Sequence, residues 1–265
     1  MYSPARTAQG CLLIASLALV GCASDDNATT SKPSDGNQHV NSTDPTGVYN
    51  DDFGISHRIA APAWNVGDDV FTFVAFDAED DQLVAQNAAT NAYFPGLYSR
   101  FDWATDADGR LRYCQTVYNA ESATAATSVA RADESDWEKG CAGFAWSTLT
   151  GPSILGSYLD SYQGSHVITA AAWVMGGQGA STFHLLVLSN AQRYLIAEND
   201  AANPYNPSKF SRFDWLSDET GALYYCQTAY AAESAAAALA VPAAVESDLA
   251  KGCAGFPWTK LVPAV

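Results

Sequence analysis

The sequence predicts a mainly β protein made of two tandem homologous domains, each an antiparallel sheet of the sandwich or barrel type. Three observations predict this fold class. Segment 99–144 aligns without gaps on segment 211–256, and about two thirds of the aligned positions are identical. Short β-branched and aromatic runs alternate with turn residues in both copies. Both copies also hold two cysteines at the same spacing. We expect one short helix and one disulfide in each domain.

The two repeats are expected to span 47–150 and 156–265. Their identical blocks are SRFDW, YCQT and KGCAGF. Upstream of these blocks the match is weaker, but Gly, Tyr, His and Trp residues still recur at corresponding positions. Two copies are too few for a propeller or a solenoid, so the duplication predicts two similar domains rather than one repeat array.

Residues 1–21 have the pattern of a signal peptide. Arg6 precedes the apolar run 12–20, which is too short to span a bilayer as a stable helix. The run ends in Leu19-Val20-Gly21-Cys22, which resembles the bacterial lipobox, where a peptidase cuts before a lipidated cysteine. The resemblance implies acylation of Cys22, palmitate included. Because Ala23 and Ser24 follow the cysteine rather than Asp, it also implies sorting to the outer membrane. The alternative is an ordinary secretory signal cleaved at Ala23 or later.

Residues 22–46 are predicted to be the lipidated cysteine and a disordered tether. From Ser24 to Thr46 the segment has one aliphatic residue besides Ala and no aromatic residue. Such a segment cannot bury enough apolar surface to offset its chain entropy.

The β elements can be placed from local patterns. Segments 70–76 and 183–188 have the composition of half-buried strands. SRFDW is expected to form a strand with Arg100 and Asp102 on one face, where they form a local ion pair. A turn at 106–109 then leads into a hairpin strand from 111. Ala-rich segments 120–129 and 232–241 predict the single helix of each repeat, the second one stopped by Pro242.

Four cysteines remain once Cys11 and Cys22 are assigned to the signal peptide and the lipid. They allow three pairings. A repeat that once folded alone could pair only its own cysteines, which predicts Cys114–Cys141 and Cys226–Cys253. A zinc site is the rival, but the closely spaced cysteine pairs typical of zinc sites are absent, and an oxidising compartment favours disulfides. We expect no metal and no cofactor.

The charge balance restricts the partners. Asp and Glu number 29 against 13 Lys and Arg, a formal net charge of −16. Without a basic cluster the chain is not expected to bind nucleic acid. The expected partners are the membrane, through the lipid anchor, and a glycan or an envelope protein.

Candidate ligand-binding residues are His57 and Trp64, with their counterparts His166 and Trp173. Identical blocks are expected to define the scaffold, so ligand contact is expected in the less similar N-terminal half of each repeat. An imidazole beside an indole could recognise a sugar ring through one polar and one apolar contact. The alternatives are a buried structural histidine, and one metal ligand or acid–base residue in each domain. The six duplicated tryptophans are expected to lie mainly in the core.

The repeat blocks resemble a repeat of lipoproteins of Gram-negative bacteria, a resemblance that implies envelope localisation and no particular mechanism. The sequence therefore predicts a lipid-anchored envelope binding or interaction protein, with carbohydrate as the expected ligand and no enzymatic activity. The alternative is a periplasmic or surface hydrolase acting on polysaccharide, with Glu121, Glu233 and Asp102 as its acids.

Overall fold

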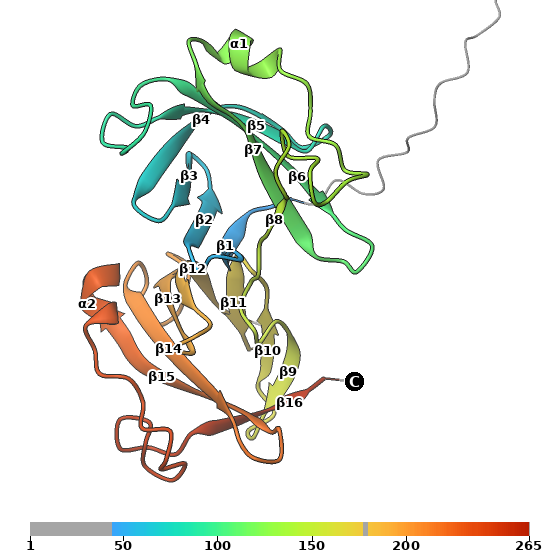
Figure 1. Ribbon diagram of the computed structural model, residues 1–265. Coiled ribbons are helices and arrows are strands. Elements are labelled where there is room, and N and C mark those ends of the chain that lie inside the picture. Colours follow the sequence, from blue (N-terminus) through green and yellow to red (C-terminus); the bar gives the residue numbers. More distant parts are fainter. Residues whose placement is uncertain (1–43, 177–179, 265) are drawn as a thin grey trace, which may run out of the picture. The chain divides into compact units, whose positions relative to one another are not determined.

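The computed structural model describes residues 44–176 and 180–264 (Figure 1). The signal peptide, Cys22 and the tether up to residue 43 lie outside the described residues, so the lipobox and the lipid anchor stay predictions. The described residues form sixteen strands and two short helices. The predicted fold class is confirmed: two eight-stranded antiparallel sheets, each with one helix and one disulfide.

The first repeat is an antiparallel meander in the order β1 to β8. Its strands are β1 Gly47–Asn50, β2 Ser56–Ala60, β3 Ala63–Val66, β4 Asp69–Asp77, β5 Gln82–Asn87, β6 Tyr98–Thr105, β7 Leu111–Ala120 and β8 Ser147–Thr148. Each strand pairs with the next one along the chain, and an isolated bridge between Asn50 and Thr150 joins the two edges of the sheet. The sheet therefore curls into a half-barrel.

The second repeat has the same strand order but closes completely, because β16 pairs with β9. Its strands are β9 Gly156–Asp160, β10 Ser165–Ile168, β11 Ala172–Met175, β12 Ser181–Ser189, β13 Tyr194–Asn199, β14 Phe210–Ser217, β15 Leu223–Ala232 and β16 Thr259–Pro263. β16 is longer than its counterpart β8, and this extra length supplies the residues that pair with β9.

Aromatic side chains fill the interior of each sheet. Trp64 stacks on Phe101 with ring centroids 4.6 Å apart in the first repeat, and Trp173 lies 4.8 Å from Phe213 in the second. The period-two alternation of strands aims these residues inward. All six duplicated tryptophans are buried, which confirms their assignment to the core: Trp64, Trp103, Trp146, Trp173, Trp215 and Trp258.

The helices are shorter than predicted. Helix α1 spans Ala123–Thr127 and α2 spans Ala235–Leu239, and a serine side chain caps the N-terminus of each. The guanidinium of Arg100 donates to the carbonyls of Thr127 and Val129, which holds the chain where it leaves the helix. No helix in 44–176 or 180–264 is long and apolar enough to cross a membrane.

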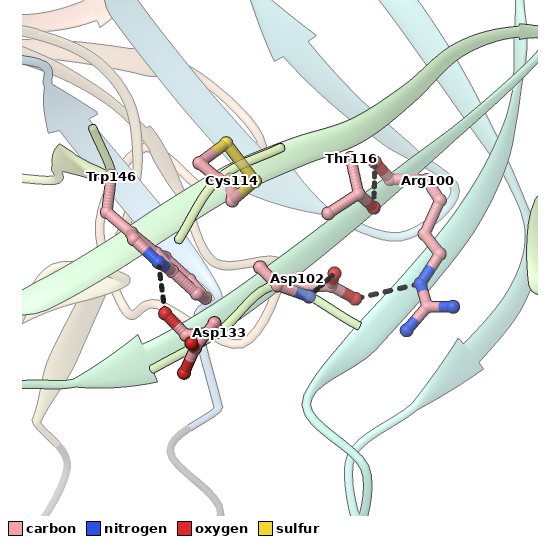
Figure 2. Close-up of a disulfide and its surroundings, with 8 residues drawn as sticks. Arg100, Asp102, Cys114, Thr116, Asp133 and Trp146 are labelled. Atoms are coloured by element: carbon pink, nitrogen blue, oxygen red, sulfur yellow. Dashed lines mark hydrogen bonds and ion pairs between the residues drawn. A yellow bond between two sulfur atoms is a disulfide. The ribbon is translucent and has the colours of Figure 1, made fainter. Parts of the chain in front are cut away.

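Arg100 and Asp102 form the predicted ion pair on the outer face of β6 (Figure 2). The Nε atom of Arg100 lies 2.8 Å from Oδ1 of Asp102, whose other oxygen accepts the backbone N–H of Ala132. Arg212 and Asp214 repeat the pair in β14. Both pairs are buried because the helix and the segment after it cover this face.

The disulfides Cys114–Cys141 and Cys226–Cys253 are present as predicted. Each ties the middle of β7 or β15 to the long segment that follows the helix.

Because each disulfide joins cysteines separated by 27 residues, replacing Cys114 and Cys141 together by Ser is expected to lower the free energy of unfolding by about 3 kcal/mol. Chemical denaturation measures this loss, and the matched pair Cys226→Ser with Cys253→Ser should lose a similar amount. A loss below about 1 kcal/mol in both variants would show that the disulfides are not needed to hold the covering segments.

Candidate functional site

The predicted pairs His57–Trp64 and His166–Trp173 each come together, but inside the sheet. Trp64 Nε1 donates to Nδ1 of His57 over 3.1 Å, and Trp173 makes the same bond to His166. Both histidines are 2% exposed and both tryptophans 0%. This burial favours the structural alternative. Ligand contact by these four residues stays a prediction, since no contact in the structure tests it.

Each imidazole belongs to a hydrogen-bonded Asp–His–Trp chain, in which the histidine and the tryptophan are buried. Because Nδ1 of His57 accepts from Trp64, its Nε2 carries the proton, and Nε2 lies 3.4 Å from Oδ2 of Asp51. Oδ1 of Asp51 accepts the backbone N–H groups of Phe53 and Ile55. Both ring nitrogens are thus occupied, and the aspartate holds the turn between β1 and β2.

The second repeat reproduces this chain with Asp160 in place of Asp51. Oδ2 of Asp160 lies 3.3 Å from Nε2 of His166, and its other oxygen accepts the N–H groups of Tyr162 and Gly164. Burial by itself would raise the pKa of Asp160, but these hydrogen bonds outweigh it and lower the pKa.

Burial also shifts the pKa values of the two histidines and of the tyrosines that pack against them. It lowers the pKa of His57 and of His166 below the ordinary value of 6.5, against the opposing effect of the neighbouring aspartate. It raises the pKa of Tyr225 to about 12, with the charge of Asp160 adding to the effect. Burial likewise raises the pKa of Tyr113, whose ring centroid lies 4.9 Å from that of His57. At neutral pH the histidines and tyrosines of this region are therefore uncharged.

The lowered histidine pKa predicts a pH-dependent stability. Below about pH 6.5 each histidine of the unfolded chain binds a proton, whereas the buried histidines of the folded chain stay neutral to a lower pH. Protonation therefore favours the unfolded state, and stability that is present above this pH is lost as the pH falls. Protonation would also turn Nδ1 into a donor facing the Trp64 N–H. We expect the denaturant concentration at the unfolding midpoint to decrease when the pH is lowered from about 7.5 to about 5.5.

The matched control is the double variant His57→Gln with His166→Gln, whose amide can accept from Trp and donate to Asp without titrating. Its midpoint should change little over that interval. An equal pH dependence in both proteins would show that other groups cause it.

Exposed aromatic side chains form a second feature repeated in both copies. We call six of them the aromatic rim: Phe53, Tyr93 and Tyr118 in the first repeat, and Tyr162, Tyr205 and Tyr230 at the matching positions of the second. Their exposed fractions agree between copies, for example 74% for Tyr93 and 78% for Tyr205. An exposed aromatic side chain buries little apolar surface, so a group of them at matched positions of both copies contributes little to the core and is a candidate contact surface.

The three rim residues of each repeat lie at the same end of the sheet. In an antiparallel meander, the turns after β1, β3 and β5 meet at one end, where β7 also finishes. Phe53 is in the first of these turns, Tyr93 is in the β5–β6 loop, and Tyr118 is near the end of β7.

A buried polar network holds the loop that carries Tyr93. The side-chain amide of Asn87 donates to the carbonyls of Phe94 and Tyr118, over 2.9 and 3.0 Å. The hydroxyl of Ser99 donates to the side-chain oxygen Oδ1 of Asn87. Asn91 accepts from and donates to the backbone of β4 at Val70. Because these asparagines are buried, the loop is a rigid support for its exposed tyrosine.

The second repeat builds the same network with Asn199, Asn203 and Ser211. Both loops also place a residue other than glycine in the left-handed region, Phe94 at φ 51° and Asn206 at φ 49°. This conformation costs about 1–2 kcal/mol for an ordinary residue. The hydrogen bonds of the asparagines hold the loops in it.

No protein-family model, curated protein or solved structure matches the chain. The site is therefore interpreted from its own geometry.

A groove of about 850 Å³ lies at the opposite end of the second barrel. Trp215 contributes to its wall, and its charged residues interact locally: Arg193 pairs with Glu246, and Lys260 lies over the ring of Tyr224.

The acids proposed for hydrolysis lie in different environments. Asp102 is 0% exposed and paired with Arg100. Glu233 is exposed and pairs with Lys209 over 2.6 Å, and Glu121 is exposed. Within 44–176 and 180–264, no three His, Cys, Asp or Glu side chains are arranged to hold a metal ion.

Sequence reasoning missed the aromatic rim, although a signal was available. Asn87, Asn91, Tyr93 and Pro95 recur as Asn199, Asn203, Tyr205 and Pro207, an N-x3-N-x-Y-x-P pattern just before the SRFDW block. Asparagine, glycine and proline residues close together are typical of a loop, and asparagine side chains can hydrogen-bond to the backbone of such a loop. The tyrosine two residues after the second asparagine, Tyr93 or Tyr205, is exposed on that loop.

Proposed function

We propose that the protein is a lipid-anchored cell-envelope binding protein that recognises carbohydrate through the aromatic rim of each repeat. The observation that carries the proposal is the grouping of three exposed aromatic side chains at one end of each sheet, at matched positions of both copies. In both repeats, buried asparagines hold the loop that carries Tyr93 or Tyr205.

Tyrosine suits this role for physical reasons. Its ring offers a flat apolar face on which the apolar face of a pyranose can pack, and its hydroxyl can donate to or accept from a sugar hydroxyl. It also loses little conformational entropy on binding, because only two side-chain torsions must be fixed. Tyr93 and Tyr205 meet these requirements on loops that are already held in place.

Binding is favoured over hydrolysis because the buried imidazoles have both nitrogens occupied. A general base needs a free nitrogen within reach of a substrate proton, and His57 and His166 offer none. Anchoring in the envelope rests on the lipobox motif ending in Cys22, which would keep the rims at the cell boundary where polysaccharides occur.

A glycan array probed with the purified full chain tests the proposal. The wild-type chain is expected to bind a defined set of glycans, and the double variant Tyr93→Ala with Tyr205→Ala is expected to lose at least about 90% of the signal, since stacking partners are removed from both rims. The control is Phe144→Ala with Phe256→Ala, which removes another duplicated exposed aromatic, 73% and 69% exposed, outside the rim. Equal loss in both variants, or no glycan bound by the wild type, would reject the proposal.

A further inference from the structure

We infer that the two aromatic rims act together on one polymeric ligand, so that the chain is a bivalent receptor for a glycan with repeating units. The inference rests on the proposed function and adds the class of ligand, a polymer rather than a single short oligosaccharide. It follows from the equivalence of the two rims and from their covalent connection.

The two rims are equivalent in their supports as well as in their exposed residues. Ser99 donates to Asn87 over 2.7 Å, and Ser211 donates to Asn199 over the same distance. The glutamine below, Gln115 or Gln227, donates to that serine over 3.0 Å in both copies. Two loops held by the same bonds present their tyrosines in the same local geometry, so a single repeating unit can satisfy both.

The rims differ at one position, where Phe53 of the first repeat aligns with Tyr162 of the second. Beside the rims, Phe94 aligns with Asn206. The surface around the first rim is therefore more apolar, whereas the second has one more hydroxyl and one more amide. Because Tyr93 and Tyr118 have counterparts in the second rim, both rims are suited to the same class of ring but with different individual affinities.

A single rim offers a few exposed rings, which predicts weak binding of one sugar unit. Joining two such sites in one chain makes the second binding event intramolecular, and the overall affinity for a polymer can then exceed that of either site by a factor of about 10² to 10⁴. The connection between the repeats is short, from Thr148 at the end of β8 to Gly156 at the start of β9. A polymer presenting many copies of the unit can benefit from this gain, while a single unit cannot.

The test uses two probes, the oligosaccharide with the strongest array signal and the same oligosaccharide attached in many copies to a polyacrylamide backbone. Calorimetry with the full chain should give a stoichiometry of two for the free oligosaccharide. Binding to the polymer should be at least about 100-fold tighter per chain. Tyr93→Ala and Tyr205→Ala, each alone, should reduce the stoichiometry to one and remove most of the gain on the polymer. The control variant Phe144→Ala with Phe256→Ala should keep the stoichiometry of two and the tighter binding of the polymer.

The outcomes separate this inference from the proposed function. A wild-type chain that binds the free oligosaccharide with a stoichiometry of one, or binds the polymer no more tightly than the oligosaccharide, would overturn bivalent binding and leave carbohydrate recognition in place. Bivalent binding would also be overturned if Tyr93→Ala and Tyr205→Ala, each alone, still bound the polymer as much more tightly than the oligosaccharide as the wild type does. A chain that binds no glycan in either form would overturn both proposals.

Discussion

Replacing His57 by Ala is expected to lower the free energy of unfolding by about 4 kcal/mol. The substitution leaves a cavity in the core and leaves the Trp64 N–H and one oxygen of Asp51 without their partner. A buried donor or acceptor left unsatisfied costs about 1–3 kcal/mol, and the cavity adds to this. Chemical denaturation of the variant and of the wild type measures the difference.

The matched control is His57→Gln, which can keep both hydrogen bonds and should lose less than half as much. The equivalent change His166→Ala should lower the free energy of unfolding by a similar amount, since the second repeat has the same Asp–His–Trp hydrogen bonds. If His57→Ala instead kept its stability and lost glycan binding, the histidine would be a ligand contact, as the sequence predicted.

Replacing Asp102 by Ala is expected to destabilise the first repeat by about 3–5 kcal/mol, because the guanidinium of Arg100 would stay buried without its counter-charge. Arg100 is 4% exposed and Asp102 is 0% exposed. The substitution would also remove the hydrogen bond that the backbone N–H of Ala132 donates to Asp102, and so weaken the attachment of the segment after the helix. Denaturation measures the loss, and Asp214→Ala is its counterpart in the second repeat.

The double variant Arg100→Met with Asp102→Leu tests the cause of that loss. Replacing both charged groups by apolar ones of similar size removes the unpaired charge, and such changes are often neutral or stabilising. We therefore expect the double variant to recover most of the stability lost in Asp102→Ala. A double variant as unstable as the single one would mean that the hydrogen bonds of Arg100 to the helix carbonyls, rather than the ion pair, hold this region.

Much of the fold could be predicted because duplication removes ambiguity. The matching cysteines selected one pairing out of three, and the alternation within SRFDW placed Arg100 and Asp102 together on one face. The closure of the second sheet could not be predicted, because it depends on the longer strand β16 and its pairing with β9, which are separated by most of the repeat. Local patterns carry no information on such a distant pairing.

Exposure is the property of the candidate site that the sequence could not predict. His57 and Trp64 were expected to be polar and apolar partners, and the structure joins them as a buried pair, 2% and 0% exposed. A recurring polar residue serves folding whenever it satisfies another buried group. Exposure distinguishes the two roles, and exposure depends on the closed sheet rather than on residue type. The recurrence of Tyr93 and Tyr205 can be seen in the sequence, but their exposure is visible only in the structure.

The most direct test of the account is fluorine NMR of the full chain labelled with fluorotyrosine, titrated with the oligosaccharide that binds most strongly on the array. Carbohydrate binding at the rims predicts that the resonances of Tyr93, Tyr118, Tyr205 and Tyr230 shift together, while those of Tyr194 and Tyr224, which lie outside the rims, stay in place. Shifts confined to Tyr194 and Tyr224, or no shift at any tyrosine while the glycan is bound, would contradict recognition through the aromatic rims.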